Sequence, residues 1–313
     1  MTRSRKAKSV AVIGYGSQGR AIAHNLRDSG FDVVVGLRPK SKSRPQARKD
    51  RVVIKTIPAA VEQADIVCFA FPDHLHAGVF KRSIAPSLKS KATLWFLHGT
   101  SVHFGLLTPP TGCDVILVAP HAPGRAVREA YLGDRSLSAF YGVAKNRSGK
   151  ALTTALSLAA GIGVRKKNLI KTSFAQEAVG DLFGEQAVLC GGLALLIKSG
   201  FDTLVKHGWK AENAWLEVAY QLDLIVALIK KHGVVGMLER ISPAARFGSL
   251  MAGPRIINRG TRTEMERLFK EIESGSFARK LARLDEQAIV RLRRELKKLS
   301  SPKMEHAARK FSR

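Results

Sequence analysis

The sequence has few acidic residues for its length. Its 313 residues include 25 Asp and Glu against 52 Lys and Arg, so the formal net charge is +27. Aromatic residues make up only 7% of the chain, and no basic stretch is interleaved with them as in a nucleic-acid stacking platform. We therefore expect a basic surface that favours phosphorylated cofactors and acidic substrates. Binding to nucleic acid or to a membrane surface is the less favoured alternative that this charge leaves open.

Cysteines and long apolar runs are also scarce. Cys68, Cys113 and Cys190 lie far apart and have neither a metal-binding nor a disulfide spacing. This cysteine usage fits a reducing, cytoplasmic compartment. No run of about 18 apolar residues is apparent, so we expect no membrane span. The basic N-terminus lacks the apolar segment of a signal peptide.

The length of the chain predicts roughly two domains. The pattern of predicted secondary structure changes near residue 172. Before this point, short β-rich runs alternate with helical patterns, which is typical of parallel βαβ units in a doubly wound sheet. The expected strands are Val10–Ile13, Val33–Gly36, Ile66–Phe71, Thr93–Leu97 and Val115–Val118. The expected helices include Ser17–Ser29, Pro58–Gln63, Leu75–Ser83 and Ala151–Gly163.

Long helical windows dominate the rest of the chain, at roughly residues 174–207, 211–232 and 262–298. We therefore predict an α/β protein with an N-terminal doubly wound Rossmann domain at residues 1–171. An all-α domain that carries metal and substrate residues is predicted at residues 172–313.

A glycine-rich motif directly follows the first expected strand and opens the first expected helix. It reads Gly14-Tyr15-Gly16-Ser17-Gln18-Gly19. In a dinucleotide-binding turn, the first glycine permits a tight turn, the second admits the pyrophosphate and the third lets helix and strand pack closely. The N–H groups at the helix start then point at the phosphates. We assign all six residues to cofactor binding.

The second expected strand indicates which nicotinamide cofactor is preferred. A site for NAD usually has an acid near the end of this strand, to bind the ribose 2′-hydroxyl. Here Arg38, Ser41 and Ser43 lie in a basic loop that also contains Lys40, Lys42 and Arg44. Guanidinium and hydroxyl groups suit a 2′-phosphate. We expect NADPH to be preferred over NADH and assign Arg38, Ser41 and Ser43 to cofactor binding.

Two carboxylates stand one helical turn apart in a long apolar stretch. They are Asp181 and Glu185, and a second helical window carries Glu217 followed four residues later by Gln221. Side chains spaced by four share one face of a helix. Two such faces can form an oxygen-lined site for a hard cation such as Mg²⁺. We therefore predict Mg²⁺ beside the nicotinamide cofactor.

Several runs of the sequence are similar to ketol-acid reductoisomerase. They are Val12–Gly19, Asn25–Arg38, Asp181–Gly192 and Gly253–Arg255. The similarity covers nearly the whole chain and matches the short form of the family. It implies an oxidoreductase that uses NADPH and Mg²⁺ in branched-chain amino-acid biosynthesis, for isoleucine and valine. Such an enzyme converts an acetohydroxy acid such as 2-acetolactate to a 2,3-dihydroxy acid. The resemblance also implies a knotted helical domain and active sites shared within a homodimer or larger homo-oligomer.

The same resemblance assigns further residues of the active site. Asp181 and Glu185 match the first metal-binding helix, Glu217 matches the first acid of the second, and Gln221 replaces the other acid of that second helix. His98 matches the catalytic histidine, and Ser242 matches the substrate-binding serine. His121 stands where the family has a lysine, and Gly124 ends the same segment, which we assign to the cofactor site. Thr100, Pro243 and Arg246 are further departures, and Arg246 can bind a substrate carboxylate.

These departures leave two enzymatic hypotheses open. In the first, the chain is a working ketol-acid reductoisomerase, in which His121 partly replaces the lysine and Gln221 offers a carbonyl oxygen. In the second, it is a diverged NADPH-dependent reductase of another 2-keto acid or related carbonyl and lacks the isomerase step. A third hypothesis is a non-catalytic, nucleic-acid-associated relative. We expect His24, His74, His76 and His103 to be structural or surface residues.

Overall fold

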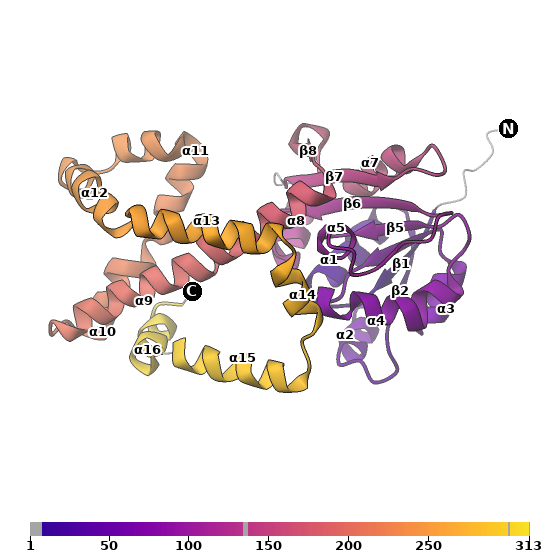
Figure 1. Ribbon diagram of the computed structural model, residues 1–313, viewed down its shortest axis with the longest axis horizontal. Coiled ribbons are helices and arrows are strands. Elements are labelled where there is room, and N and C mark those ends of the chain that lie inside the picture. Colours follow the sequence, from indigo (N-terminus) through magenta and orange to yellow (C-terminus); the bar gives the residue numbers. More distant parts are fainter. Residues whose placement is uncertain (1–7, 134–136, 300, 313) are drawn as a thin grey trace. The chain divides into compact units, whose positions relative to one another are not determined.

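The computed structural model describes residues 8–133, 137–299 and 301–312. They form two compact units, whose elements Figure 1 labels in chain order. The first unit extends to Gly180 and includes Phe277–Arg283. The second comprises Asp181–Ser276 and the chain from Leu284 onwards.

An eight-stranded sheet forms the framework of the first unit, in the order β3-β2-β1-β4-β5-β6-β7-β8. Its strands are β1 (Ser9–Ile13), β2 (Asp32–Gly36), β3 (Val53–Lys55), β4 (Ile66–Phe69), β5 (Thr93–Phe96), β6 (Asp114–Pro120), β7 (Ala139–Lys145) and β8 (Leu169–Lys171). The strand order reverses between β1 and β4. In open α/β sheets, ligands bind at such a reversal, outside the carboxyl ends of the strands.

The helical segments of the first unit connect these strands. They are α1 (Ser17–Asp28), α2 (Arg44–Lys49), α3 (Ile57–Gln63), η1 (Asp73–Leu75), α4 (His76–Val79), η2 (Phe80–Ile84), η3 (Ala85–Ser87), α5 (Thr100–His103), α6 (Gly124–Leu132), α7 (Ala151–Gly161) and η4 (Lys166–Asn168). Helix α8 (Phe174–Phe183) continues from this unit into the second.

Both faces of the sheet are buried. On one face, Val12 of β1 packs in a core cluster with Ile22 of α1 and residues of α7. On the other face, Ile13 packs with Val61 of α3. Since successive side chains of a strand point to opposite faces, a strand covered on both sides is apolar throughout. This is why the first expected strands could be recognised as continuous apolar runs.

All five expected strands are present, and the doubly wound sheet is confirmed. Strands β3 and β8 were not expected, because three residues each are too few for a pattern. The helix expected at Leu75–Ser83 is instead a succession of 3-10, α and π turns. A further difference is β7, which pairs antiparallel with β6. The register places Ala139 opposite Pro120, so β7 begins at the sheet edge where β6 ends.

The described part of the second unit contains helical segments and no strand. They are η5 (Gly184–Leu189), α9 (Gly191–Lys206), α10 (Ala211–Trp215), η6 (Leu216–Tyr220), α11 (Leu222–Arg240), α12 (Pro243–Ile256), α13 (Arg259–Glu273), α14 (Ser276–Ala282), α15 (Glu286–Leu299) and α16 (Pro302–Lys310). Most of α14 belongs to the first unit. The expected helical windows are confirmed, but η5 and η6 are π-helical.

Many apolar side chains of the second unit are exposed in the single chain. They include Leu195, Leu196, Leu224, Val234, Val235, Phe247, Leu250 and Met251. In addition, an 18-residue window within the helical run Phe174–Lys206 reaches a mean hydropathy of 1.6. By length and composition alone, this run is sufficient to cross a membrane. It contains charged residues, so it does not contradict the expectation that the chain has no uninterrupted apolar run of that length.

Candidate active site

The dinucleotide turn lies at the carboxyl end of β1 and makes close backbone contacts. Gly14 has a φ of 98°, and a Cβ there would overlap the carbonyl oxygen of Ala70. A Cβ on Gly19 would lie 2.6 Å from the carbonyl oxygen of Gly14. By contrast, a Cβ on Gly16 would meet nothing within 4 Å. Packing therefore requires glycine at positions 14 and 19, while the space beside Gly16 is open to a ligand.

Helix α1 presents polar groups with unused bonding capacity toward this turn. Its N-cap, Gly16, makes no side-chain cap, and no acidic residue lies in the first turn. The Gln18 side chain donates to the carbonyl oxygen of Ala122 over 2.7 Å. Its buried Oε1 has no partner among the described residues. Uncapped N–H groups at a helix start form an anion site, so these residues fit a bound pyrophosphate.

A cleft of about 230 Å³ joins the dinucleotide turn to the basic loop. Its lining residues include Gly14, Tyr15, Gly16, Arg38, Ser41, Ser43, Phe71 and Leu75. The structure thus brings three of the turn residues together with all three residues assigned to the 2′-phosphate. Lys40, Lys42 and Arg44 do not line the cleft.

Arg44 stabilises the shape of the basic loop. Its Nε donates to the carbonyl oxygen of Arg38 over 3.0 Å, and its Nη2 donates to that of Leu37 over 3.4 Å. The Ser41 hydroxyl accepts a hydrogen bond from the backbone N–H of Ser43 over 3.3 Å. The guanidinium of Arg44 therefore has a structural task, which leaves Arg38 as the arginine of this loop that faces the cleft.

His98 lies two residues beyond the end of β5, at the same edge of the sheet. Its Nδ1 accepts hydrogen bonds from the backbone N–H and the hydroxyl of Thr100, over 3.1 and 2.7 Å. An Nδ1 that accepts is unprotonated, so the neutral ring carries its proton on Nε2. Thr100, a departure from the family pattern, therefore orients the imidazole.

Glu177 of α8 is a buried carboxylate beside His98, and the sequence did not single it out. Its Oε2 lies 3.6 Å from His98 Nδ1 and accepts a hydrogen bond from the Gly99 N–H over 2.5 Å. A Cβ on Gly99 would overlap the carbonyl oxygen of Phe174, so glycine is required for this approach. Glu177 stands one turn before Asp181, which was the only sequence signal that could have revealed it.

The ligand atoms of His98, Glu177 and Asp181 all lie within 4.8 Å of one another. One nitrogen and two carboxylate oxygens can bind a divalent cation, and the oxygens suit Mg²⁺. Asp181 joins this group because it follows Glu177 by one turn of α8. Among the described His, Cys, Asp and Glu residues, Glu185 and Glu217 belong to no such group; both are exposed in the single chain, as is Gln221.

The segments that carry Glu185 and Glu217 are not regular α-helices. Glu185 lies in η5 and Glu217 lies in η6, where the helix is wider than an α-helix. Gln221 ends η6, and its side-chain amide donates to the carbonyl oxygen of Leu216 over 3.4 Å. A common face for Asp181 and Glu185, and for Glu217 and Gln221, stays a prediction.

His121 and Gly124 follow β6 at the same sheet edge. The exposed His121 ring lies edge-on to Phe140, with centroids 4.2 Å apart. Gly124 begins α6, and a Cβ there would overlap the carbonyl oxygen of Ser17. Gly124 thus permits α6 to begin directly against the start of α1.

The residues around Ser242 have local structural roles. Ser242 is the N-cap of α12, where its hydroxyl accepts from the Ala245 N–H over 3.2 Å. Pro243 occupies the first turn, a position that suits proline. The Arg246 guanidinium donates to the carbonyl oxygens of Leu238 and Glu239, over 3.0 and 3.2 Å. These bonds occupy donors that the sequence interpretation offered to a substrate carboxylate.

His76 is a buried histidine next to the cofactor cleft. Its Nδ1 is 2.8 Å from the Ser101 hydroxyl, and its Nε2 is 2.8 Å from the carbonyl oxygen of Phe71. Because a carbonyl only accepts, Nε2 carries the proton and Nδ1 accepts from Ser101. His76 therefore links the cleft wall at Phe71 to the loop that follows His98. The expectation of a structural role for His76 agrees with these contacts.

Comparison with known proteins assigns the chain and its fold to a family. Residues 5–168 match the family model described as acetohydroxy acid isomeroreductase, NADPH-binding domain. Residues 174–312 match the one described as ketol-acid reductoisomerase, C-terminal domain. The chain belongs to the ketol-acid reductoisomerase family. The resemblance inferred from the sequence motifs is thereby confirmed.

Similar proteins carry the same family name. A ketol-acid reductoisomerase (NADP(+)) of Xylella fastidiosa is 43% identical over 89% of this chain and 80% of its own length. One of Pyrobaculum aerophilum is 46% identical over 88% of this chain and 84% of its own. A solved NADH-preferring ketol-acid reductoisomerase from an uncultured archaeon is 35% identical, with a TM-score of 0.92. That match covers 97% of this chain and 95% of the solved one. Since the names of these proteins differ in cofactor preference, the basic loop is the feature of this chain that bears on its own preference.

The burial of His76 predicts a pH-dependent contribution to stability. Burial lowers the pKa of His76, and the nearby Asp73 and the Phe71 carbonyl oppose this shift only in part. The unfolded chain, where the histidine pKa is about 6.5, therefore binds a proton there more readily than the folded chain. Stability is lost as the pH falls below that value. Glutamine retains a donor and an acceptor without titrating, so His76→Gln should reduce the fall in Tm between about pH 7 and about pH 5.

Thermal unfolding of both proteins at a series of pH values measures this difference. The exposed His103 provides a matched control, since His103→Gln should leave the pH dependence of the Tm unchanged. Parallel Tm curves for wild type and His76→Gln would contradict the assignment of a neutral, buried His76.

Proposed function

We propose that this chain is an NADPH-dependent oxidoreductase of the ketol-acid reductoisomerase type. It would convert an acetohydroxy acid such as 2-acetolactate to a 2,3-dihydroxy acid. The observation that carries the proposal is the arrangement at one edge of the sheet. The dinucleotide turn and its basic loop line a cleft at the ends of β1 and β2, and the His98–Glu177 pair lies at the end of β5, two strands from β1 in the same sheet.

The first unit supplies the residues that bind the dinucleotide. The N–H groups at the start of α1 suit the pyrophosphate, and the Gln18 Oε1 provides a further buried acceptor. Arg38, Ser41 and Ser43 suit the 2′-phosphate. Bound NADPH would supply the hydride for reduction of the ketone, while these residues fix its position.

The His98–Glu177 pair can hold or deliver a proton. Thr100 occupies Nδ1, so the protonated Nε2 is the nitrogen that donates toward a substrate oxygen. The Glu177 carboxylate, 3.6 Å from His98 Nδ1, favours positive charge on the ring. Glu177 in turn is held by the Gly99 N–H, which fixes the pair to the end of β5.

Asp181, with Glu177 and His98 beside it, supports Mg²⁺ as the second cofactor. Bound Mg²⁺ would polarise the oxygens of the substrate. Glu185, Glu217, Gln221 and Ser242 remain proposed metal- and substrate-binding residues. All four are exposed in the single chain.

A second copy of the chain is the partner that the exposed apolar surface favours. Exposed apolar residues occur on α9, α11 and α12, including Leu195, Val235 and Leu250. Exposed apolar surface of this extent marks an interaction surface. We propose a homodimer or larger homo-oligomer that buries it. A cytoplasmic location is part of the same proposal, and the unpaired thiols of Cys68, Cys113 and Cys190 support it.

A diverged reductase without the isomerase step is the second candidate function. Two observations favour it. The Gln221 amide is neutral and donates to a backbone carbonyl, and the Arg246 donors are likewise bound to carbonyl oxygens. Each missing carboxylate weakens the hold on Mg²⁺, on which alkyl migration depends more than hydride transfer does.

The two functions differ in the substrate that the enzyme accepts. With NADPH and Mg²⁺, the purified protein should oxidise NADPH in the presence of 2-acetolactate and form a 2,3-dihydroxy acid. It should also reduce the corresponding 3-hydroxy-2-keto acid, which requires no migration. Absorbance of NADPH and chromatography of the product measure both reactions. Turnover of the second substrate alone would favour the diverged reductase, and turnover of neither would refute both.

Replacing Glu177 by glutamine should slow the reaction without weakening cofactor binding. Glutamine can still accept from the Gly99 N–H but does not stabilise a charged His98. We expect kcat to fall about 10²-fold, as for loss of general acid–base support, while the dissociation constant of NADPH stays constant. Glu264→Gln, an exposed change on α13, is the matched control. An unchanged kcat would remove Glu177 from the mechanism.

The oligomeric state tests the proposed partner. Light scattering on the wild-type protein should give the mass of at least two chains. Phe247→Glu on α12 places a charge in the exposed apolar surface and should shift the protein toward monomers. Val53→Glu, on the edge strand β3 of the first unit, is an equally exposed apolar position and should not do so. A monomeric wild type would contradict the proposal.

A further inference from the structure

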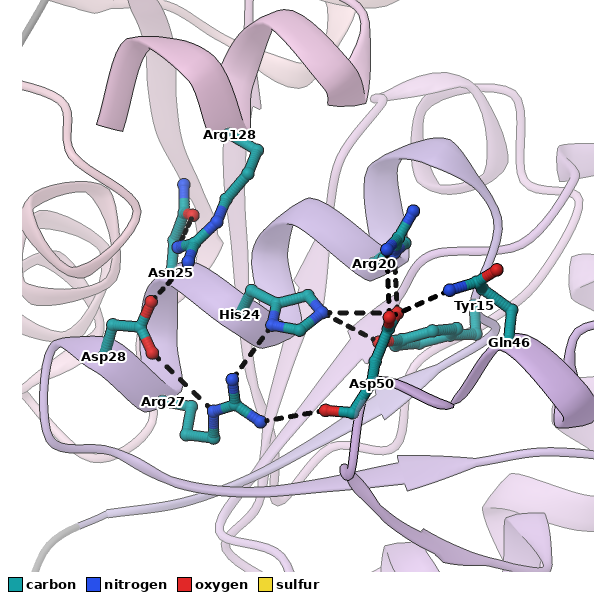
Figure 2. A network of polar contacts seen from close by, with 9 residues as sticks. All are labelled: Tyr15, Arg20, His24, Asn25, Arg27, Asp28, Gln46, Asp50 and Arg128. Atoms are coloured by element: carbon teal, nitrogen blue, oxygen red, sulfur yellow. Dashed lines mark hydrogen bonds and ion pairs between the residues drawn. The ribbon is translucent and has the colours of Figure 1, made fainter. Parts of the chain in front are cut away.

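A polar network surrounds Asp50, directly behind the dinucleotide turn (Figure 2). Arg20 of α1 binds the carboxylate with two nitrogens, Nε to Oδ2 over 2.6 Å and Nη2 to Oδ1 over 2.9 Å. Tyr15 donates its hydroxyl to Oδ2 over 2.9 Å, and Gln46 of α2 donates to Oδ1 over 2.8 Å. Both oxygens thus accept two hydrogen bonds, from residues of the turn, of α1 and of α2.

The hydrogen bonds behind Tyr15 run in one direction. Arg27 can only donate, so His24 Nδ1 accepts from its Nη2 over 3.0 Å. The proton of His24 then lies on Nε2, which donates to the Tyr15 hydroxyl over 3.1 Å. Tyr15 in turn donates to Asp50. The chain of donors fixes the Tyr15 hydroxyl, whose residue stands between the first two glycines of the dinucleotide turn.

The carboxylate stays ionised within this network. Burial alone raises the pKa of Asp50, but hydrogen bonds from Arg20, Tyr15, Gln46 and His24 outweigh burial and hold the pKa well below its usual range. Burial and the bond to Asp50 also raise the pKa of Tyr15, so its hydroxyl remains a donor. The network is therefore charged and complete at neutral pH.

Asp50 is also the C-cap of α2, and α2 is continuous with the basic loop. Arg44, at the start of α2, bonds back to the carbonyl oxygens of Leu37 and Arg38. At the other end, Arg27 of α1 donates to the Asp50 carbonyl oxygen over 3.3 Å. The loop and the short helix α2 therefore form one rigid piece, whose far end is attached to α1 through Asp50.

We propose that Asp50 is a positioning residue that sets the preference for NADPH over NADH, from outside the cofactor cleft. The inference rests on the proposed function. Asp50 does not line the cleft, whereas Arg38, Ser41 and Ser43 do. It acts by holding α2, and with it these three residues, at a fixed distance from the turn that binds the pyrophosphate.

The two cofactors depend differently on this distance. The pyrophosphate, common to both, is bound by the turn and the start of α1. The 2′-phosphate, present only in NADPH, is bound by the loop attached to α2. If the loop moves relative to the turn, the binding of NADPH is therefore weakened more than the binding of NADH. A change that only destabilises α1 weakens the binding of both cofactors equally.

The test compares Asp50→Asn with Asp28→Asn, measuring NADPH and NADH dissociation constants by fluorescence titration of the full chain. Asp28 is the last residue of α1 and, like Asp50, pairs with arginines: Arg128 over 2.6 Å and Arg27 over 3.6 Å, neither of which belongs to α2 (Figure 2). Asp50→Asn should lower the preference for NADPH about tenfold, as expected when a supporting residue shifts a binding group. Asp28→Asn should leave the preference unchanged.

A second variant keeps the test decisive if Asp50→Asn does not fold. Arg20 is half-exposed, and Arg20→Gln removes the paired contacts while Tyr15 and Gln46 remain bound to Asp50. It should lower the NADPH preference in the same direction and by less.

Two outcomes overturn the inference, and they are distinguishable. The first outcome is a wild type that prefers NADPH, with Asp50 and Arg20 variants that weaken the binding of both cofactors by the same factor or leave both unchanged. This outcome refutes the positioning role. If the wild type itself binds NADPH no better than NADH, the proposed NADPH dependence fails, and the inference fails with it.

Discussion

At Gly14 and Gly19, the backbone of the dinucleotide turn lies closer to its neighbours than a side chain would permit. A Cβ on Gly14 would overlap the Ala70 carbonyl beyond β4, and a Cβ on Gly124 would overlap the Ser17 carbonyl at the start of α1. Because of these contacts, the ends of β1, β4 and β6 meet at one edge of the sheet. This arrangement positions the cofactor cleft and the loops that carry His98 and His121.

Local features of the chain were readable from the sequence. The turn Gly14–Gly19, the basic loop and the five central strands each depend on residues that are neighbours in sequence. The pairing of His98 with Glu177 was not readable, since 79 residues separate them and Glu177 resembles any acid on an amphipathic helix. Its role depends on Gly99, whose missing side chain lets α8 approach. Long-range contacts of this kind leave no pattern in a single sequence.

The second unit shows a different limit of sequence interpretation. The helices and the acids Asp181, Glu185 and Glu217 were expected, but the spacing argument assumed α-helical geometry. Segments η5 and η6 are instead π-helical. The exposed apolar surface was also unexpected. A helical periodicity indicates that one face of a helix is covered. It does not distinguish a face covered by the protein core from one covered by a second subunit.

The shortage of acids gives each buried carboxylate of the first unit a specific task. Asp114 accepts from the backbone N–H groups of Arg147 and Ser148, Glu177 accepts from Gly99, and Asp50 joins α1 to α2. In each case a carboxylate holds donors from segments distant in sequence. Removing Asp114 or Glu177 leaves backbone N–H groups without their partner, which costs more than losing a solvated lysine. With 52 basic residues against 25 acids, the chain tolerates changes of basic residues more readily than changes of these few acids.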